Sequence, residues 1–225
     1  RNGNWQLFLA KIARKEEANF PNATIIEEEV LLPSATVERA YPQFSPDGKE
    51  LAFIEERNRL MVINLDTKKV RQITDGSTWF STDGNFDYQW SPDGKWFTLE
   101  FIGNRHDPYS DIGLVSAKGD SPITNLTNSG YMSGSPRWVL DGNAILFTTE
   151  RYGMRAHASW GSQNDAMLVF MNQDAYDKFR LSKEDYELQK ELEKEQKEVT
   201  GDKTDDKKKE DTMIEEIDAL HLDKI

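Results

Sequence analysis

The stretch Ser45-Pro46-Asp47-Gly48-Lys49 occurs a second time as Ser91-Pro92-Asp93-Gly94-Lys95, and Val139-Leu140-Asp141-Gly142-Asn143 is an altered third copy. In a type I turn, serine suits the first position, proline fixes φ at the second, and glycine is accommodated at the fourth. The aspartates at 47, 93 and 141 are 46 and 48 residues apart. A period of this length, with hairpin turns and short strands, is typical of β-propeller blades.

The segments on both sides of the three turns also align. Before the turns stand Pro42-Gln43-Phe44, Tyr88-Gln89-Trp90 and Pro136-Arg137-Trp138, and after them come Leu51-Ala52-Phe53, Phe97-Thr98-Leu99 and Ile145-Leu146-Phe147. Short segments rich in aromatic and aliphatic residues, bounded by turn residues, indicate β-strands. We therefore predict an all-β fold of four-stranded antiparallel propeller blades, incomplete at about three and a half blades.

The repeat divides the chain into four parts. We expect 1–33 to be the outer half of a blade begun upstream, 34–76 and 77–130 to be one blade each, and 131–225 to be a blade with an insertion at about 172–213. The expected strands lie at 5–12 and 24–32, at 40–44, 50–55, 60–64 and 70–74, at 122–125, and at 136–138, 144–149 and 166–171.

The insertion in the last blade is rich in Lys and Glu. Ser182 is the predicted N-cap of a helix over 186–199, with Asp185 reaching back to it as in a capping box. The charged stretch 201–211 is typical of disorder, and order is expected to resume at Ile214, where a missing outer strand would follow. The helix is either a solvated face with a linker or a docking helix for a partner domain.

Composition excludes several classes of function. A net charge of -12 argues against a nucleic-acid backbone as partner, and no apolar run has the length of a membrane span. The absence of cysteine removes disulfides, zinc-thiolate sites and thiol nucleophiles. There is no His-Glu-x-x-His zinc motif, no Gly-x-Ser-x-Gly elbow and no phosphate-binding loop, and nothing orients a base towards Ser159. We expect no catalytic residue, no metal and no cofactor in this segment.

In a meandering blade, the turns after strands one and three lie on one face and the connections after strands two and four on the other. The segments 76–85, 103–110, 127–134 and 151–164 should therefore gather opposite the repeated turns, and the connection after strand two lengthens from blade to blade. Cations and aromatic rings on one face would hold an anion such as a peptide carboxylate. The alternative is that the arginines pair with the local carboxylates Asp107, Asp111 and Glu150. The candidate binding residues are Arg105, His106, Arg151, Arg155 and His157, beside the aromatic residues Trp79, Phe80, Tyr109, Tyr131 and Trp160.

The Ser-Pro-Asp-Gly-Lys blades resemble the propellers of TolB-like proteins, prolyl-oligopeptidase relatives and tricorn-type peptidases. The stretch ERYGMRAHASWGSQND (150–165), followed by DAYDKFRLSKE (174–184) and the charged insertion, is similar to the N-terminal propeller of a bacterial tricorn protease homologue. This resemblance covers nearly the whole chain.

In that family the propeller stacks with a second propeller, and a PDZ module and a serine peptidase domain follow. The resemblance implies a non-catalytic segment that filters or guides peptides to a distant serine peptidase site, in a periplasmic or otherwise extracytoplasmic protein, with the cytoplasm as the alternative. The family's adjacent arginine pair for peptide carboxylates is not matched, because Arg151 and Arg155 are separated. The rival interpretations are a TolB-type interaction propeller without peptidase activity and the cap of an α/β-hydrolase peptidase. Open sheet edges also predict self-association.

Overall fold

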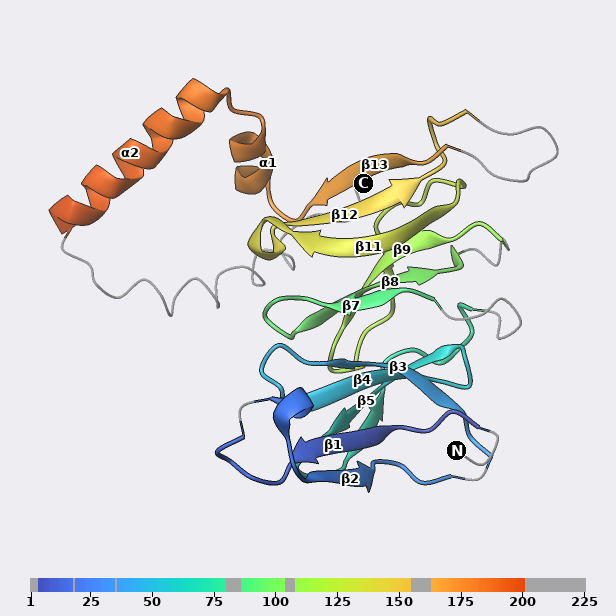
Figure 1. Ribbon diagram of the computed structural model, residues 1–225. Helices are drawn as coiled ribbons and strands as arrows, with labels where there is room; N and C mark the ends of the chain where they lie inside the picture. Colours follow the sequence, from blue (N-terminus) through green and yellow to red (C-terminus); the bar gives the residue numbers. More distant parts are fainter. Residues whose placement is uncertain are drawn as a thin grey trace. The chain divides into compact units, whose positions relative to one another are not determined.

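The computed structural model describes residues 4–17, 19–34, 36–79, 86–103, 108–154 and 163–200, with the backbone alone for 194–200. The chain forms two compact units, which are described separately (Figure 1). The first unit comprises Arg1–Phe86 and Val115–Pro122, and the second comprises Asp87–Leu114 and Ile123–Ile225.

The first unit contains a two-stranded and a four-stranded antiparallel sheet. In the larger sheet the strands pair in chain order, so that each neighbour along the sequence is a neighbour in space. A short 3-10 helix, Phe20–Asn22, lies between the two strands of the smaller sheet. The strands are β1 (Phe8–Ile12) and β2 (Ile26–Val30) in the small sheet, and β3 (Arg39–Phe44), β4 (Glu50–Glu55), β5 (Arg59–Asn64) and β6 (Val70–Gln72) in the large one.

The second unit carries a further four-stranded sheet and a three-stranded sheet, again with the strands in chain order. The predicted all-β fold of four-stranded antiparallel blades is confirmed. The fourth strand proposed near Ile214 lies outside the described residues. The strands are β7 (Tyr88–Trp90), β8 (Trp96–Phe101), β9 (Asp111–Ser116, of which the last two residues are counted with the first unit) and β10 (Thr124–Asn125), then β11 (Ser133–Val139), β12 (Ala144–Thr149) and β13 (Asp165–Phe170).

Each unit has its own apolar core, built from the inward-facing residues of its strands. In the first unit, Leu7 and Leu31, which flank the strands of the small sheet, pack with Leu51, Phe53 and Ile63 of the large one. The core of the second unit joins its two sheets. Because Phe53 is fully buried, its replacement by alanine is expected to cost about 3–5 kcal/mol. The second core consists of Ile112, Leu114, Leu126, Ile145, Phe147 and Met171.

The two Ser-Pro-Asp-Gly turns have the predicted geometry. The amide of Gly48 donates to the Ser45 carbonyl at 2.9 Å, and the amide of Gly94 donates to the Ser91 carbonyl at the same distance. Both glycines have φ of +71°, which favours glycine over any residue with a side chain. In the first turn the Ser45 hydroxyl donates to the Asp47 carboxylate at 2.7 Å. That hydrogen bond, followed by one from the Lys49 amide, holds the pKa of Asp47 below its usual value.

The third turn lies where the repeat places it, but its backbone differs. Leu140 and Asp141 have φ of +52° and +55°, in the left-handed region. Proline at this position in the first two copies excludes such a conformation, because its ring holds φ near −65°. Leu140 is therefore free to adopt a turn that Pro46 and Pro92 forbid. This turn forms the short helix η4 (Leu140–Gly142), closed by a 3.0 Å hydrogen bond from the Asn143 amide to the Leu140 carbonyl.

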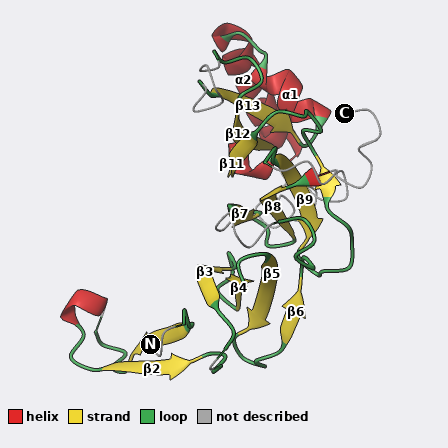
Figure 2. Ribbon diagram, turned by 90° about the vertical axis from the view of Figure 1, so that its right-hand side faces the viewer, coloured by secondary structure: helices red, strands yellow, loops and turns green. Residues whose placement is uncertain are grey.

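Two helices follow β13: α1 (Gln173–Phe179), which was not predicted separately, and α2 (Lys183–Thr200) (Figure 2). The ring of Phe170 packs against Tyr176 at 5.4 Å, which seats α1 beside its strand. Ser182 caps α2 as predicted, since its hydroxyl accepts from the Asp185 amide at 3.1 Å. Asp185 reaches the Ser182 hydroxyl, not the Ser182 backbone amide, at 2.8 Å. Neither helix in the described part of the chain is long and apolar enough to cross a membrane.

Candidate functional site

Three connections of the second unit meet at one end of its sheets, as the alternation of connections predicted. They follow β8, β10 and β12. The Ser133 amide donates to the Ser110 carbonyl at 2.8 Å, and the Ser110 hydroxyl donates back to the Ser133 carbonyl at 2.8 Å. The hydroxyls of Ser133 and Thr149 lie 3.3 Å apart. We call the described residues of these connections, 108–110, 126–132 and 150–154, the loop rim.

A buried carboxylate anchors the base of the loop rim. Asp111 is 6% exposed. One of its oxygens accepts from the Thr127 hydroxyl at 2.6 Å and from the Ser129 amide at 3.2 Å, and the other accepts from the Asn125 side-chain amide at 2.9 Å. A buried carboxylate is tolerated where hydrogen bonds replace its hydration. Asp111 therefore holds the connection after β10 against the first residue of β9.

The connection after the second strand of each sheet lengthens along the chain. It occupies 56–58 in the first unit, 102–110 after β8, and 150–164 after β12. The longest connection begins as a continuation of the β12–β13 pair, because the Gln163 amide donates to the Met154 carbonyl at 3.0 Å. A Cβ on Gly153 would lie 1.6 Å from the Gln163 carbonyl oxygen, so only glycine fits this stem. The predicted lengthening is thus present in the fold.

The loop rim exposes large side chains. Tyr152 and Met154 are 68% and 74% exposed, and Tyr109 and Met132 are also exposed. The guanidinium of Arg151 lies over the Tyr152 ring, 5.3 Å from its centroid. Tyrosine, methionine and arginine are enriched where proteins bind other polypeptides. Methionine adapts to varied apolar partners, and arginine forms paired hydrogen bonds with carboxylates. The rim can therefore hold an apolar side chain next to a carboxylate.

The structure places some of the predicted binding residues and not others. Arg151, Tyr109 and Tyr131 lie in the loop rim. Arg105, His106, Arg155 and His157 lie outside the described residues, as do Phe80 and Trp160. Trp79 belongs to the first unit, where it packs against Phe86 at 5.6 Å.

The described partners of Asp111 are Thr127, Ser129 and Asn125. The alternative that the candidate arginines pair with local carboxylates stays a prediction, because Arg105 and Arg155 lie outside the described residues. Asp107 lies outside the described residues. Within the part of the chain that the structure describes, the contact of the Arg151 guanidinium is with the Tyr152 ring and not with a carboxylate. Among the same residues, no group of three or more His, Asp or Glu side chains is arranged to hold a metal ion.

The sequence reasoning missed Tyr152 and Met154. Both stand in the segment chosen for its cations, and they alternate with Arg151 and Gly153 along the chain. Alternation of apolar and other residues over a short run indicates a β-strand, here an extension of β12 into the connection that follows it. Extending β12 past Thr149 by this rule would have shown that the two side chains share one face.

The chain is similar in sequence to propeller-type regions of peptidases. Residues 22–97 match the family described as the dipeptidyl peptidase IV N-terminal region. Over 119 residues the chain is 29% identical to the "Uncharacterized peptidase YuxL" of Bacillus subtilis (strain 168), an alignment that covers 51% of this chain and 18% of that protein. The chain therefore spans about a fifth of the length of this curated relative.

Among solved structures, the tricorn protease is similar with a TM-score of 0.49 and 14% identity, over 66% of this chain and 15% of that one. A prolyl endopeptidase structure has a TM-score of 0.46 and 19% identity, over 66% of this chain and 24% of that one. An oligogalacturonate lyase has a TM-score of 0.45 and 15% identity, over 66% of this chain and 43% of that one. No activity follows from likeness at this level. The sequence matches support the predicted peptidase association of this propeller segment, and the narrower tricorn and TolB resemblances stay predictions.

Proposed function

We propose that this chain is a non-catalytic propeller segment of a serine peptidase, and that its loop rim receives peptides on their way to a separate peptidase domain. The sequence matches to peptidases support the class of protein. The proposed partners are peptides and the further propeller, PDZ and peptidase domains of a parent chain. Because the chain spans only part of its relatives, the peptidase activity belongs to this wider proposal.

The observation that carries the proposal is the loop rim. A scaffold of paired strands holds three connections together through Ser110, Ser133 and Thr149. Tyr109, Tyr152 and Met154 lie in these connections and are exposed, so their side chains do not stabilise a core. Loops positioned by a rigid scaffold are the usual place for binding residues.

Electrostatics favours the carboxylate end of a peptide. The chain has a net charge of -12, so most of its surface repels anions. Arg151 offers a guanidinium held by its contact with Tyr152, and its donors are available for two parallel hydrogen bonds to a carboxylate. An apolar C-terminal side chain would lie against Tyr152 or Met154. We therefore propose that the rim prefers peptides with a free carboxylate and an apolar last residue.

Fluorescence anisotropy with short labelled peptides tests this proposal. Each peptide is used with a free C-terminus and as its C-terminal amide, against the wild type, Arg151→Ala and Arg180→Ala. Arg180 is a matched control, because its guanidinium lies over the Tyr176 ring at 5.4 Å, much as Arg151 lies over Tyr152. We expect Arg151→Ala to weaken binding of the free acids about tenfold, equivalent to about 1.4 kcal/mol. Equal binding by all three proteins, or equal binding of acids and amides, would contradict the proposal.

The non-catalytic role has its own test. Incubation of the isolated chain with the same peptides should yield no cleavage products. Cleavage that disappears in Ser159→Ala would overturn this expectation, since it would place a nucleophile in the segment.

A second candidate is the propeller of an α/β-hydrolase peptidase, which the match of residues 22–97 to the dipeptidyl peptidase IV N-terminal region favours. The two candidates differ in the catalytic domain of the parent protein. A PDZ module followed by a serine peptidase domain supports the first, and a Gly-x-Ser-x-Gly hydrolase domain supports the second. Sequencing the parent gene beyond the codon for Ile225 separates them.

A further inference from the structure

A pocket of about 620 Å³ lies in the second unit, between the third of the repeated turns and the two helices that follow β13. Leu140, Asp141 and Asn143 line it from the turn, and residues of α1 and α2 line it from the other side. Cavities of this size are typical of small-molecule sites. The pocket is thus built by the altered copy of the repeat together with the inserted helices.

The aspartate of the third turn has lost the role that its two counterparts have. In the first turn the serine hydroxyl and the lysine amide donate to Asp47 at 2.7 and 3.1 Å, and the second turn has the same two hydrogen bonds. Val139 stands at the serine position and has no hydroxyl, and the Asn143 amide donates instead to the Leu140 carbonyl at 3.0 Å. Among the residues that the structure describes, none donates to the Asp141 carboxylate. Its charge therefore lines the pocket without holding the turn.

The helix side of the pocket carries a charge of opposite sign. Lys183 is the first residue of α2 and lines the pocket. A cation at this end opposes the helix dipole, which favours the carboxylates Glu184 and Asp185 of the same turn. Lys183 has no ion pair with Asp141 or with any other carboxylate in the described part of the chain. Neither helix stability nor a local ion pair accounts for this lysine.

The other polar groups that line the pocket are engaged within the fold. The Lys178 ammonium lies 3.1 Å from the Glu193 carboxylate. The Ser182 hydroxyl donates to the Asp185 carboxylate and accepts from its amide. The Asn143 side chain donates to the carbonyl at the start of the turn at 2.8 Å. A ligand would therefore meet one free carboxylate and one free ammonium group.

Apolar side chains form the rest of the wall and remain open to a ligand. Phe179, Tyr186 and Leu140 line the pocket and are 57%, 50% and 46% exposed. The Phe179 ring is held in place by the ring of Phe170, with 5.2 Å between their centroids. Because burial of apolar surface is favourable, these side chains would bind an aliphatic or aromatic group between them.

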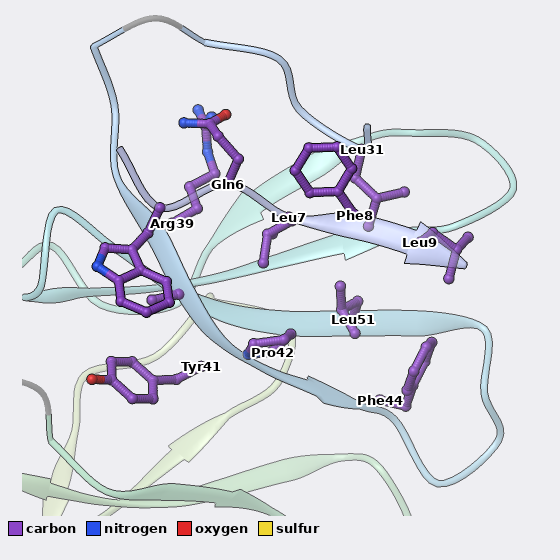
Figure 3. Close-up of a pocket in the computed structure, with 12 residues that line it drawn as sticks. Gln6, Leu7, Phe8, Leu9, Leu31, Arg39, Tyr41, Pro42, Phe44 and Leu51 are labelled. Carbon is purple, nitrogen blue, oxygen red and sulfur yellow. The ribbon is translucent and has the colours of Figure 1, made fainter. Parts of the chain in front are cut away.

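The apolar groove of the first unit, of about 510 Å³, shows what a pocket without free charges looks like (Figure 3). Leu7, Pro42 and Phe44 are among its apolar walls. Among the described residues that line it, the one charged side chain is Arg39, which donates to the Glu55 carboxylate at 2.9 Å. That groove has no free charge with which to select a ligand, whereas the pocket beside the helices has two.

We propose that the pocket beside the helices binds a short zwitterion with an apolar side chain, either a free amino acid or a dipeptide. The Asp141 carboxylate accepts hydrogen bonds from the ammonium group of the ligand, and Lys183 donates to its carboxylate. The apolar side chain lies against Phe179 and Tyr186. Hydrogen bonds between charged groups are the strong ones, and a ligand that lacks either charge leaves one pocket charge unpaired. The site is separate from the loop rim and does not depend on the function proposed for it.

Titrations of the intact, nitrogen-15-labelled chain, followed by the NMR shifts of its amides, test the proposal. The probes are leucine, leucyl-leucine, N-acetyl-leucyl-leucine, which has no ammonium group, and leucyl-leucine amide, which has no carboxylate. We expect leucine or leucyl-leucine to cause saturable shifts at residues 140–143 and 175–186, and each blocked form to bind about tenfold more weakly than leucyl-leucine. No shift at these residues, or shifts at the loop rim instead, would overturn the proposal.

Two variants assign each charge to one end of the ligand. Lys183→Gln should weaken leucyl-leucine about tenfold and leave the affinity for its amide unchanged, because the amide has no carboxylate to lose. Asp141→Asn should do the same for leucyl-leucine and leave the N-acetyl form unchanged, and asparagine accommodates the φ of +55° at this position. The control Lys190→Gln, also in α2 but outside the pocket, should stay within about twofold of the wild type.

The blocked probes need no substitution, so they decide the matter even if a variant fails to fold. Equal binding of leucyl-leucine and both blocked forms would show that neither charge is recognised. If the N-acetyl form bound as tightly as leucyl-leucine, the pocket would take a simple anion. Variants that weakened every probe equally would show a structural role for the two residues. Each of these results would overturn the proposal.

Discussion

The two ends of the strand pairs in the second unit are built in opposite ways. At one end the β7–β8 turn uses Ser91-Pro92-Asp93-Gly94, with the Ser91 hydroxyl donating to Asp93 at 2.5 Å and accepting from the Trp96 amide at 2.9 Å. At the other end the connections after β8 and β12 run over 102–110 and 150–164. The short turns satisfy their own polar groups within a few residues. The long connections depend on Asp111, Ser133 and Thr149 from other strands.

This contrast distinguishes the scaffold from the loop rim that we propose as the binding surface. A turn that satisfies its own hydrogen bonds can be repeated from blade to blade. It carries no exposed aromatic side chain that would serve binding. A connection that is anchored at its base is free to vary above the anchor, as loops on a rigid scaffold do. Tyr152 and Met154 stand above that anchor and are exposed.

Asp111→Ala should have the largest effect. The half-buried donors of Thr127, Asn125 and Ser129 lose their buried acceptor, which is expected to lower the free energy of unfolding by about 2–4 kcal/mol. Urea unfolding followed by tryptophan fluorescence measures this. Ser91→Ala at the turn end serves as control, with an expected loss of about 1 kcal/mol. A loss at Asp111 no larger than the loss at Ser91 would show that the loop rim does not depend on this anchor.

Leu140→Pro should cause the second largest loss of stability. It restores the residue type of the first two turns but forces φ near −65°, where the structure has +52°. The expected loss of unfolding free energy is about 1–3 kcal/mol, larger than the loss of about 0.4–1 kcal/mol for Pro92→Leu. Thermal unfolding compares the two variants. If Leu140→Pro stabilised the protein, the left-handed third turn would be wrong.

The pH dependence of protein stability tests the burial of Glu100, which lies in β8 near the connection that follows this strand. Burial raises the pKa of its carboxyl above the ordinary value of 4.5, against the Ser135 and Asp87 amides that lower it. For a raised folded-state pKa, the contribution to stability is fully present below the unfolded pKa and is lost as pH rises through the folded pKa. The stability of the wild type relative to Glu100→Gln should therefore fall as pH is raised from about 4 to 7. A difference that stays constant or grows over this range would contradict the burial of Glu100.

Tyr152→Ala and Met154→Ala should change stability least. Both side chains are exposed, so each substitution is expected to alter the free energy of unfolding by no more than about 0.5 kcal/mol. Denaturant unfolding of the two variants checks this, with Phe97→Ala in the core as the comparison, since Phe97 is fully buried. A loss above about 2 kcal/mol at either rim residue would mean that it packs into the fold and is not held for binding.

The strands could be predicted from the sequence because turn chemistry and apolar runs are local. The expected strand over 50–55 matches β4 residue for residue, and that over 144–149 matches β12. The strand at 122–125 is shorter in the structure, where β10 is Thr124–Asn125. Strand ends depend on the length of the partner strand, which a local pattern does not contain.

The features that the sequence did not reveal depend on contacts between distant residues. The left-handed Leu140 is one, because leucine has no local preference for that conformation. The anchoring of the loop rim by Asp111 is another, since its partners lie 14 to 18 residues away. The helix α1 is different: Asn172 caps it by accepting from the Ala175 amide at 2.8 Å, a local signal that was present in the sequence.

We propose that peptides bind at the loop rim and not at the turns. Hydrogen exchange with and without a saturating C-terminal acid peptide tests it directly, because bound peptide slows exchange where it covers backbone amides. We expect slower exchange at the loop rim, residues 108–110, 126–132 and 150–154, with no change at the turns 45–49 and 91–95. Slower exchange at the turns, with unchanged exchange at the rim, would contradict it.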